Sequence, residues 1–225
     1  MRLTRAVFNI ALILWFFVRT SPVAGAVTAD RACAMAARAA TVARDLPPGM
    51  LDAIGVVESG RSVRDPSVGD RGDPLRARRH AWPFTVDADG IGHWFANAAD
   101  AARFVRVSLA DGARAVDVGC FQIDLEDHPG AFASLRDAFD PVTNAGYAAG
   151  FLVRLHQRLG SWPAAIAAYH SADPSLGGPY AALVRAAWLG DGGGAPGATG
   201  GRPVEDRHVI ALGPVGRGLP RIVTP

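Results

Sequence analysis

Apolar residues recur at helical spacing in one segment after another along the middle of the chain, and Gly or Pro separates these segments. Each amphipathic helix must bury its apolar stripe against another element, so the pattern predicts a mainly α domain of the α+β class. The chain has 225 residues, of which 49% are hydrophobic, and this is enough for one domain with a core. The predicted helices are residues 28–46, a short segment between the Pro47-Pro48-Gly49 break and Gly60, and residues 97–112, 131–139, 141–159, 162–171 and 179–189.

The predicted β structure is small. The runs WPFTV at 82–86 and IGHWF at 91–95 flank the turn-forming residues 87–90, which predicts a short hairpin. Residues 113–125 begin like a strand and bend at Gly119. Residues 61–79 lose all periodicity and are rich in Gly, Pro, Asp and Arg, so we expect an exposed loop there.

The two ends of the chain differ in character from the middle. Residues 1–26 have Arg2 and Arg5, then an apolar run and the small-residue end Ala24-Gly25-Ala26, as a secretory signal peptide does. An uncleaved membrane anchor is the alternative. Residues 190–225 are rich in Gly and Pro and predict a disordered tail. The folded domain is therefore expected to cover residues 27–189, in the periplasm or outside the cell after cleavage near Ala26.

Charge excludes some classes of function. The net charge of +2 includes Arg2, Arg5 and Arg19, so loss of the signal peptide leaves about −1. Apart from RARRH at 76–80, no basic cluster remains, and nucleic-acid binding is not expected. Every basic residue is Arg and none is Lys, which excludes Schiff-base and Ser-Lys chemistry.

The only two cysteines, Cys33 and Cys120, both lie in the part that would be exported. In an oxidising compartment we expect them to pair and to stabilise the domain by roughly 4.5 kcal/mol in the chain-entropy estimate. Two buried thiols are the alternative.

Glu58 occupies an unusual position. In AIGVVESGR, 53–61, it falls in the last turn of a helix, on the same apolar stripe as Leu51 and Ile54. A carboxylate is disfavoured at the negative end of a helix and costly to bury, and both effects raise its pKa. A glutamic acid that keeps its proton near neutral pH is suited to general acid catalysis. Packing or surface placement is the alternative reading.

The other candidates for chemistry are weaker. The histidines at 80, 93, 128 and 170 lack an H-x-x-x-H spacing, so neither a metal nor a cofactor is expected. Asp65, Asp70 and Asp73 share one segment and either supply a second carboxylate or form turns. Four aromatic residues either line a sugar-binding cleft or pack the hairpin core, namely Trp82, Trp94, Phe95 and Phe121.

Several motifs occur in an order that resembles the SLT-domain lytic transglycosylases. They are ESGR at 58–61, VGCFQID at 118–124, FDPVTNAGYAAGFL at 139–152 and AAYHSA at 167–172, followed by a final helix with Tyr180. The resemblance covers about residues 33–188. The WPFTVDADG insertion is similar to that of a secreted bacterial subgroup with specialised roles. The resemblance implies a lysozyme-like helical fold and the peptidoglycan glycan strand as substrate.

The resemblance also implies roles for single residues. Glu58 matches the catalytic acid and base, with Ser59 beside it, and Gln122 matches the glutamine of a motif that shapes the cleft and contacts sugar. Tyr169 matches a tyrosine whose hydroxyl lies near the catalytic carboxyl. His170 stands where the family has asparagine, so that polar contact departs from the pattern. The predicted substrate-binding residues are Ser59, Phe121, Gln122, Tyr169 and His170. Cys120 stands where most members have an apolar residue, which fits a disulfide to Cys33.

In that family, the glutamate protonates the glycosidic oxygen between N-acetylmuramic acid and N-acetylglucosamine. It then acts as a base, directing the muramoyl 6-hydroxyl onto the anomeric carbon, and the product is a 1,6-anhydro sugar. A hydrolytic muramidase and a catalytically idle glycan-binding subunit of an envelope machine are the alternatives. The expected partner is peptidoglycan, bound by a monomer, with a secretion, conjugation or flagellar assembly as a further candidate.

Overall fold

The computed structural model describes residues 28–63 and 78–190. The expected signal peptide lies outside these residues, as do Asp65, Asp70, Asp73 and all of the expected tail except Gly190. About 60% of the described residues are helical, and the chain also forms a small antiparallel sheet. The fold is therefore mainly α within the α+β class. No helix among the described residues has the length and apolar character needed to cross a membrane.

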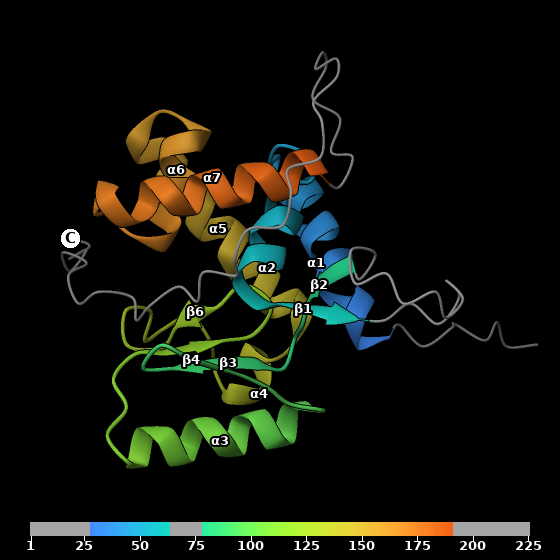
Figure 1. The fold of residues 1–225 in the computed structure, drawn as a ribbon, viewed down its shortest axis with the longest axis vertical. Coiled ribbons are helices and arrows are strands. Elements are labelled where there is room, and N and C mark those ends of the chain that lie inside the picture. Colours follow the sequence, from blue (N-terminus) through green and yellow to red (C-terminus); the bar gives the residue numbers. More distant parts are fainter. Residues whose placement is uncertain (1–27, 64–77, 191–225) are drawn as a thin grey trace, which may run out of the picture.

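The helices α1, α2, α5, α6 and α7 form the upper half of the molecule in Figure 1. They pack as neighbouring pairs, with α1 against α2 and α5, and α7 against α2 and α6. Their apolar stripes meet in one core that includes Leu51, Ile54, Leu152 and Tyr180, each no more than 1% exposed. The bounds are α1 Ala29–Arg44, α2 Met50–Ser59, α5 Pro141–Leu159, α6 Trp162–His170 and α7 Pro174–Gly190.

The corner between α1 and α2 follows from local backbone chemistry. Asp45 ends α1 in the left-handed conformation, with φ of 53°, and its N–H donates to the carbonyl of Thr41. Pro47-Pro48 cannot continue the helix, and Gly49 adopts a φ of 79° before α2 begins. The predicted break is confirmed, and it lets α2 turn back onto α1.

A four-stranded antiparallel sheet forms the lower half of Figure 1, in the order β4-β3-β5-β6. Helix α3 (Ala98–Ala110) packs against one face, together with the short α4 (Leu135–Ala138). Val86, Val105 and Val118 are fully buried between them. The strands are β3 Thr85–Ala88, β4 Ile91–Trp94, β5 Val116–Val118 and β6 Ile123–Asp124.

The predicted hairpin is present, but it is only half of this sheet. Its first strand starts at Thr85, later than predicted, and its turn is the pair Asp89-Gly90, with φ of 51° and 86°. Two left-handed residues are typical of the type I′ turn that Asp-Gly favours. The bend predicted at Gly119 is confirmed, and it folds β6 back beside β5.

Three sequence predictions of elements were wrong in part. The ends of the expected loop 61–79 pair as antiparallel strands, β1 Gly60–Val63 and β2 Arg78–Ala81. The helix predicted at 131–139 begins only at Leu135, because Ser134 caps it through the N–H of Asp137. The helix predicted at 179–189 starts at Pro174 and contains Pro179, whose missing N–H costs one hydrogen bond in a helix held by buried side chains.

A disulfide joins the two halves of the molecule. Cys33 of α1 and Cys120, in the turn between β5 and β6, are bonded across a sequence separation of 87, with their Cα atoms 5.7 Å apart. The predicted pairing is confirmed, and it fits a protein of an extracytoplasmic compartment. Both sulfurs lie in the helical core, so the bond fixes the β5–β6 turn against α1.

Candidate functional site

Glu58 lies in the last turn of α2, where the helical half meets the sheet. Its side chain is partly buried, and its Oε1 accepts a hydrogen bond from the hydroxyl of Tyr180 at 2.6 Å. No basic residue stands in the last turn of α2. The carboxyl group is thus held by a neutral donor.

Burial raises the pKa of Glu58 from 4.5 to about 7. The hydrogen bond from Tyr180 lowers that pKa, and the negative charge of Asp87 raises it, but both effects are smaller than the effect of burial. At neutral pH the residue is therefore present as both acid and base. This is the protonation behaviour expected of a group that first gives and then takes a proton.

Tyr180, which donates to Glu58, was not predicted as a site residue. It lies in α7, it is 1% exposed, and the ring of His170 stacks on it with centroids 4.6 Å apart and planes 10° from parallel. Burial lowers the pKa of His170. In the sequence, Tyr180 has the helical spacing of an ordinary core residue. The only signal of its role is that the motifs resembling the family end with a helix that carries this tyrosine.

Ser59 follows Glu58 but faces the interior. The residue is 1% exposed. Its hydroxyl donates to the carbonyl of Cys120 at 2.8 Å and accepts from the N–H of Trp82 at 3.1 Å. These contacts join the end of α2 to the β5–β6 turn. The placement supports a structural role for Ser59 and leaves no free hydroxyl for the predicted contact with substrate.

Phe121 and Tyr169 also lie inside the protein. Phe121 is fully buried against Gly55 of α2, where a Cβ would come within 3.0 Å of its ring. The hydroxyl of Tyr169 donates to the carbonyl of Phe121 at 2.7 Å rather than to Glu58. Burial, and after it the charge of Glu58, raises the pKa of Tyr169, so the two groups are nevertheless electrostatic neighbours. The predicted substrate contact does not suit Phe121, whose ring is part of the core.

Gln122 stands at the partly buried edge of the same turn. Its backbone has a φ of 44°, and its Nε2 donates to the carbonyls of Gly119 and Thr85 at 2.9 and 3.3 Å. The side-chain amide therefore holds the turn in shape. The predicted contact of Gln122 with sugar stays a prediction.

Asn144 supports this turn from α5, and it was not among the predicted site residues. The side chain is fully buried, and its Oδ1 accepts from the N–H of Phe121 at 2.9 Å. Its Nδ2 donates to the carbonyls of Val118 and Ala138 at 3.1 and 3.0 Å. One amide thus pairs with three backbone groups, at the end of β5, in the turn and at the end of α4.

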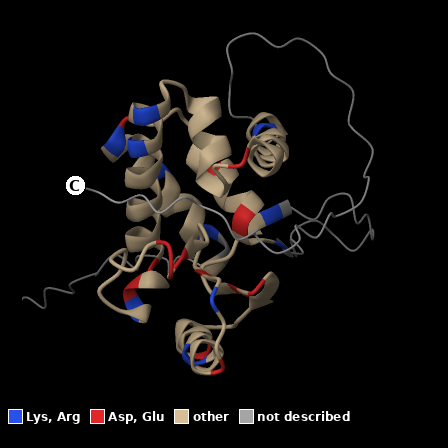
Figure 2. Cartoon of the chain, turned by 90° about the vertical axis from the view of Figure 1, so that its left-hand side faces the viewer, with Lys and Arg blue, Asp and Glu red and all other residues tan. Residues whose placement is uncertain are grey.

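Figure 2 shows several acidic segments, in red, at mid-height of the molecule, above the helix at the bottom of the view. The negative charge of Asp87 acts on Glu58. Asp87 of β3 is paired in register with Asp117 of β5, and Asp117 is paired with Asp124 of β6. Burial, then the neighbouring carboxyl groups, raise the pKa of Asp117 well above its usual value. Among the described residues, no group of three or more His, Cys, Asp or Glu side chains is arranged to hold a metal ion.

Two tryptophans flank the end of α2. Trp94 of β4 is 52% exposed, and its Nε1 lies 3.4 Å from the carbonyl of Ser59. Trp82 donates to the carbonyl of Phe95 at 2.7 Å and carries the guanidinium of Arg61 over its ring at 4.2 Å. The exposed Trp94 face suits the apolar side of a sugar ring, whereas Trp82 is used within the protein.

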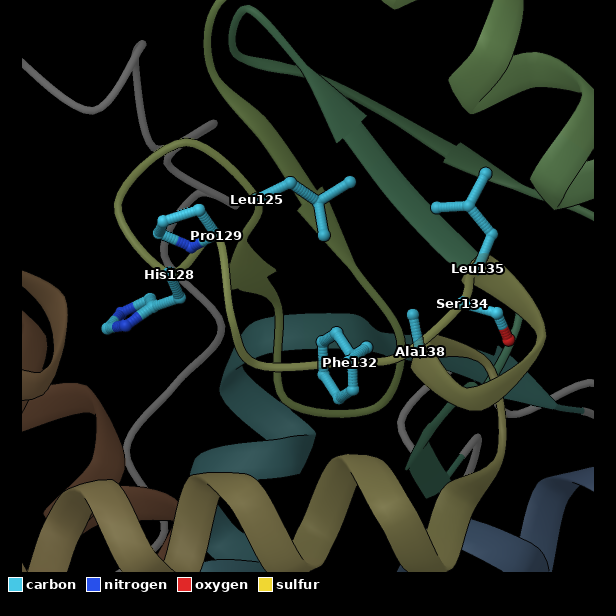
Figure 3. Close-up of a pocket in the computed structure, with 7 residues that line it drawn as sticks. All are labelled: Leu125, His128, Pro129, Phe132, Ser134, Leu135 and Ala138. Atoms are coloured by element: carbon cyan, nitrogen blue, oxygen red, sulfur yellow. The ribbon is translucent and has the colours of Figure 1, made fainter.

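A cavity of about 190 Å³ lies between the sheet and α5 (Figure 3). The ring of His128 borders this cavity, and its Nδ1 forms a hydrogen bond with the hydroxyl of Tyr147 at 2.9 Å. None of the cavity's lining residues hydrogen-bonds to Glu58 or stacks on Tyr180. They are Leu125, His128, Pro129, Phe132, Ser134, Leu135 and Ala138.

Comparison of the chain with models of protein families, with characterised proteins and with solved structures finds no match. The chemistry around Glu58 is therefore the basis for a functional proposal.

Proposed function

We propose that this protein is a peptidoglycan lytic transglycosylase with a lysozyme-like fold that acts in the cell envelope after export. The observation that carries the proposal is Glu58, a partly buried carboxyl group with a pKa of about 7 at the junction of the two halves. The order of the sequence motifs supports it, and so does the disulfide, which fits an oxidising compartment.

In the proposed reaction, Glu58 donates its proton to the glycosidic oxygen, and the bond from that oxygen to the muramoyl anomeric carbon breaks. The hydroxyl of Tyr180 then stabilises the new carboxylate, to which it already donates. The carboxylate then takes the proton of the muramoyl 6-hydroxyl, and the oxygen of that hydroxyl forms the new bond to the anomeric carbon. Glu58 ends protonated, no water is consumed, and one protein carboxyl group suffices.

The first test compares digestion of peptidoglycan sacculi by the wild type, Glu58→Gln and Glu126→Gln. Glu126 is an exposed glutamate and serves as the matched control. We expect soluble muropeptides from the wild type and from the Glu126 variant, and a loss of at least about 100-fold in the Glu58 variant. If the Glu58 variant stays active, Glu58 is not the acid; if no variant cleaves but all bind sacculi, the protein is an idle glycan-binding subunit.

A hydrolytic muramidase is the second candidate, and the acidic sheet face is the observation that favours it. Glycosidases commonly use two carboxyl groups, one of them ionised. Asp87 acts on Glu58 as a negative charge and is the residue to test. A muramidase of this kind would lose most of its activity in Asp87→Asn, whereas the transglycosylase would keep its anhydro products and show a pH optimum moved to lower pH.

A further inference from the structure

One face of the four-stranded sheet carries a row of aspartates that the proposed reaction leaves unused. Asp87, Asp117 and Asp124 are directly paired across β3, β5 and β6, and directly paired residues on neighbouring strands share a face. Val86 and Val118 alternate with them and are buried towards α3. The aspartates therefore point to the side of the sheet away from α3.

This face lies against the end of α2. Trp94 is paired with Thr85, which lies two residues before Asp87 on the same strand, so the three side chains share the face. The indole Nε1 of Trp94 reaches the carbonyl of Ser59, next to Glu58. The row of aspartates thus borders the site of Glu58.

Asp117 and Asp124 lie directly opposite each other on the neighbouring strands β5 and β6. Their carboxyl groups are within hydrogen-bonding reach of each other, and two carboxyl groups form a hydrogen bond only when one of them is protonated. Burial raises the pKa of Asp124, but its Oδ1 accepts from the N–H groups of Glu126 and Asp127 at 2.6 and 2.8 Å, and these donors favour its ionised form. Asp117 has no such donors among the causes that act on its pKa. A proton bound by this pair therefore belongs on Asp117.

The surroundings of Asp117 also favour its neutral form. Burial raises its pKa, and the charges that act on it come from Asp124, Glu58 and Asp87, all of which raise that pKa further. Burial raises the pKa of Asp87 as well, but Asp87 is less enclosed than Asp117. The N–H of Gly90, which donates to its Oδ1 at 2.7 Å, and the nearby His93 act against that rise.

We propose that Asp117 is a neutral positioning residue of the Glu58 site: as a carboxylic acid it donates a hydrogen bond to the Asp124 carboxylate, and it faces Glu58 without adding a second negative charge. This inference rests on the proposed function in taking Glu58 as the working acid. It rules out Asp117 as a nucleophile or as a base for water at neutral pH, since both roles need a carboxylate. Asp87 is then the charge on this face that tunes Glu58.

The small number of glutamates makes the proposal measurable. The sequence has only Glu58, Glu126 and Glu205, so a protein labelled with ¹³C at the glutamate carboxyl groups gives three signals, and Glu58→Gln assigns one of them. The titration midpoint of Glu58 is then compared between the wild type, Asp117→Asn and Asp87→Asn. The Asn at 117 keeps the shape and a donor to Asp124.

We expect Asp117→Asn to leave the Glu58 midpoint within about 0.2 pH units of the wild-type value, because a neutral group replaces a neutral group. Asp87→Asn should lower it by about half a pH unit, because a negative charge is removed. A fall in Asp117→Asn as large as that in Asp87→Asn would show that Asp117 is ionised and would overturn the proposal.

A measurement on the wild type covers the case in which Asp117→Asn does not fold. With ¹³C at the aspartate carboxyl groups, one signal should keep the chemical shift of a carboxylic acid through pH 7; ionisation of every aspartate below that pH contradicts the proposal. Both measurements are independent of cleavage. A protein that titrates as expected but does not cut peptidoglycan refutes the proposed function alone.

Discussion

At the scale of single residues, the hydroxyl of Tyr180 controls how strongly Glu58 holds its proton. The hydrogen bond stabilises the carboxylate and so lowers its pKa, against the larger effect of burial. The ring of Tyr180 is itself held by the stacked ring of His170. Position and protonation of the acid therefore depend on two residues from α6 and α7.

Replacing Tyr180 by Phe should raise the pKa of Glu58 above its value of about 7, because the donor is lost while the ring and its stacking remain. The ¹³C titration of Glu58 measures this shift directly. Tyr169→Phe is the matched control, since its hydroxyl donates to Phe121 and not to Glu58. An unchanged or lower midpoint in Tyr180→Phe would show that the hydroxyl does not stabilise the carboxylate.

The raised pKa of Glu58 also makes stability depend on pH. The folded state holds this proton up to about pH 7, whereas the unfolded chain releases it near 4.5, so the stabilisation is complete below pH 4.5 and is lost as the pH rises to 7. Relative to wild type, the unfolding free energy of Glu58→Gln should therefore increase between pH 4 and 8, by about 2 to 3 kcal/mol.

Denaturant unfolding of the two proteins across this pH range gives the value, with Glu126→Gln as the control. A difference that stays constant with pH would mean that Glu58 titrates in the folded protein as it does in the unfolded chain.

Sequence reasoning reached Glu58 but not Tyr180, and the reason is physical. A carboxyl group on an apolar helical stripe conflicts with local stability and so draws attention. A tyrosine on such a stripe conflicts with nothing, because its ring suits the core and only the fold shows where its hydroxyl points. The same limit applies to Ser59, whose burial depends on contacts with Cys120 and Trp82.

At the scale of elements, the turn between β5 and β6 connects the sheet to the helical half. Gly119 begins this turn with a φ of 83°, and a Cβ there would lie 2.5 Å from Nδ2 of Asn144 and 2.8 Å from the carbonyl oxygen of Ala138. Both the backbone and the space therefore require glycine.

Gly119→Ala should destabilise the protein by about 3 kcal/mol or more, because the left-handed φ and the displaced amide of Asn144 both cost free energy. Gly112→Ala is the matched control, with a φ of 96° and no atom within 4 Å of the added Cβ, and should cost about 1 kcal/mol. Denaturant unfolding measures both. Equal losses would show that backbone conformation alone explains the glycine at 119.

Elements with strong local signals were predictable, and those set by distant contacts were not. Asn97 and Asp100 predicted the start of α3, where the Asn97 side chain accepts from the N–H of Asp100. Strands β1 and β2 pair although residues 64–77 separate them in the sequence, and neither strand shows a periodic pattern that would predict it. Residues 131–133 are apolar enough for a helix, but Ser134 caps the N-terminus of α4, so the helix begins only after it.

At the scale of the whole molecule, the disulfide holds the sheet-side turn against the helical core. Cys33→Ser with Cys120→Ser should lower the unfolding free energy by roughly 4 kcal/mol, because the bond closes a long loop in the unfolded chain. Denaturant unfolding of the double variant and of reduced wild type should agree. A loss below about 1 kcal/mol in both would show that the packing of the two halves needs no covalent support.

The position of the acidic row is a property of the complete fold. Asp87, Asp117 and Asp124 come from three strands, and only the register of the sheet places them side by side. The sequence instead suggested Asp65, Asp70 and Asp73 as a second source of carboxyl groups, and these lie outside the described residues. The mainly helical character was predictable from periodicity, but the four-stranded sheet was not, because β5 and β6 are short.

The most direct test of the proposed function is digestion of sacculi in water enriched in ¹⁸O, followed by mass spectrometry of the products. A transglycosylase in which Glu58 directs the 6-hydroxyl gives 1,6-anhydro muramoyl products without the label. Reducing-end muramoyl products that carry one ¹⁸O at the anomeric carbon would show that water is the nucleophile, and would contradict the transglycosylase reaction.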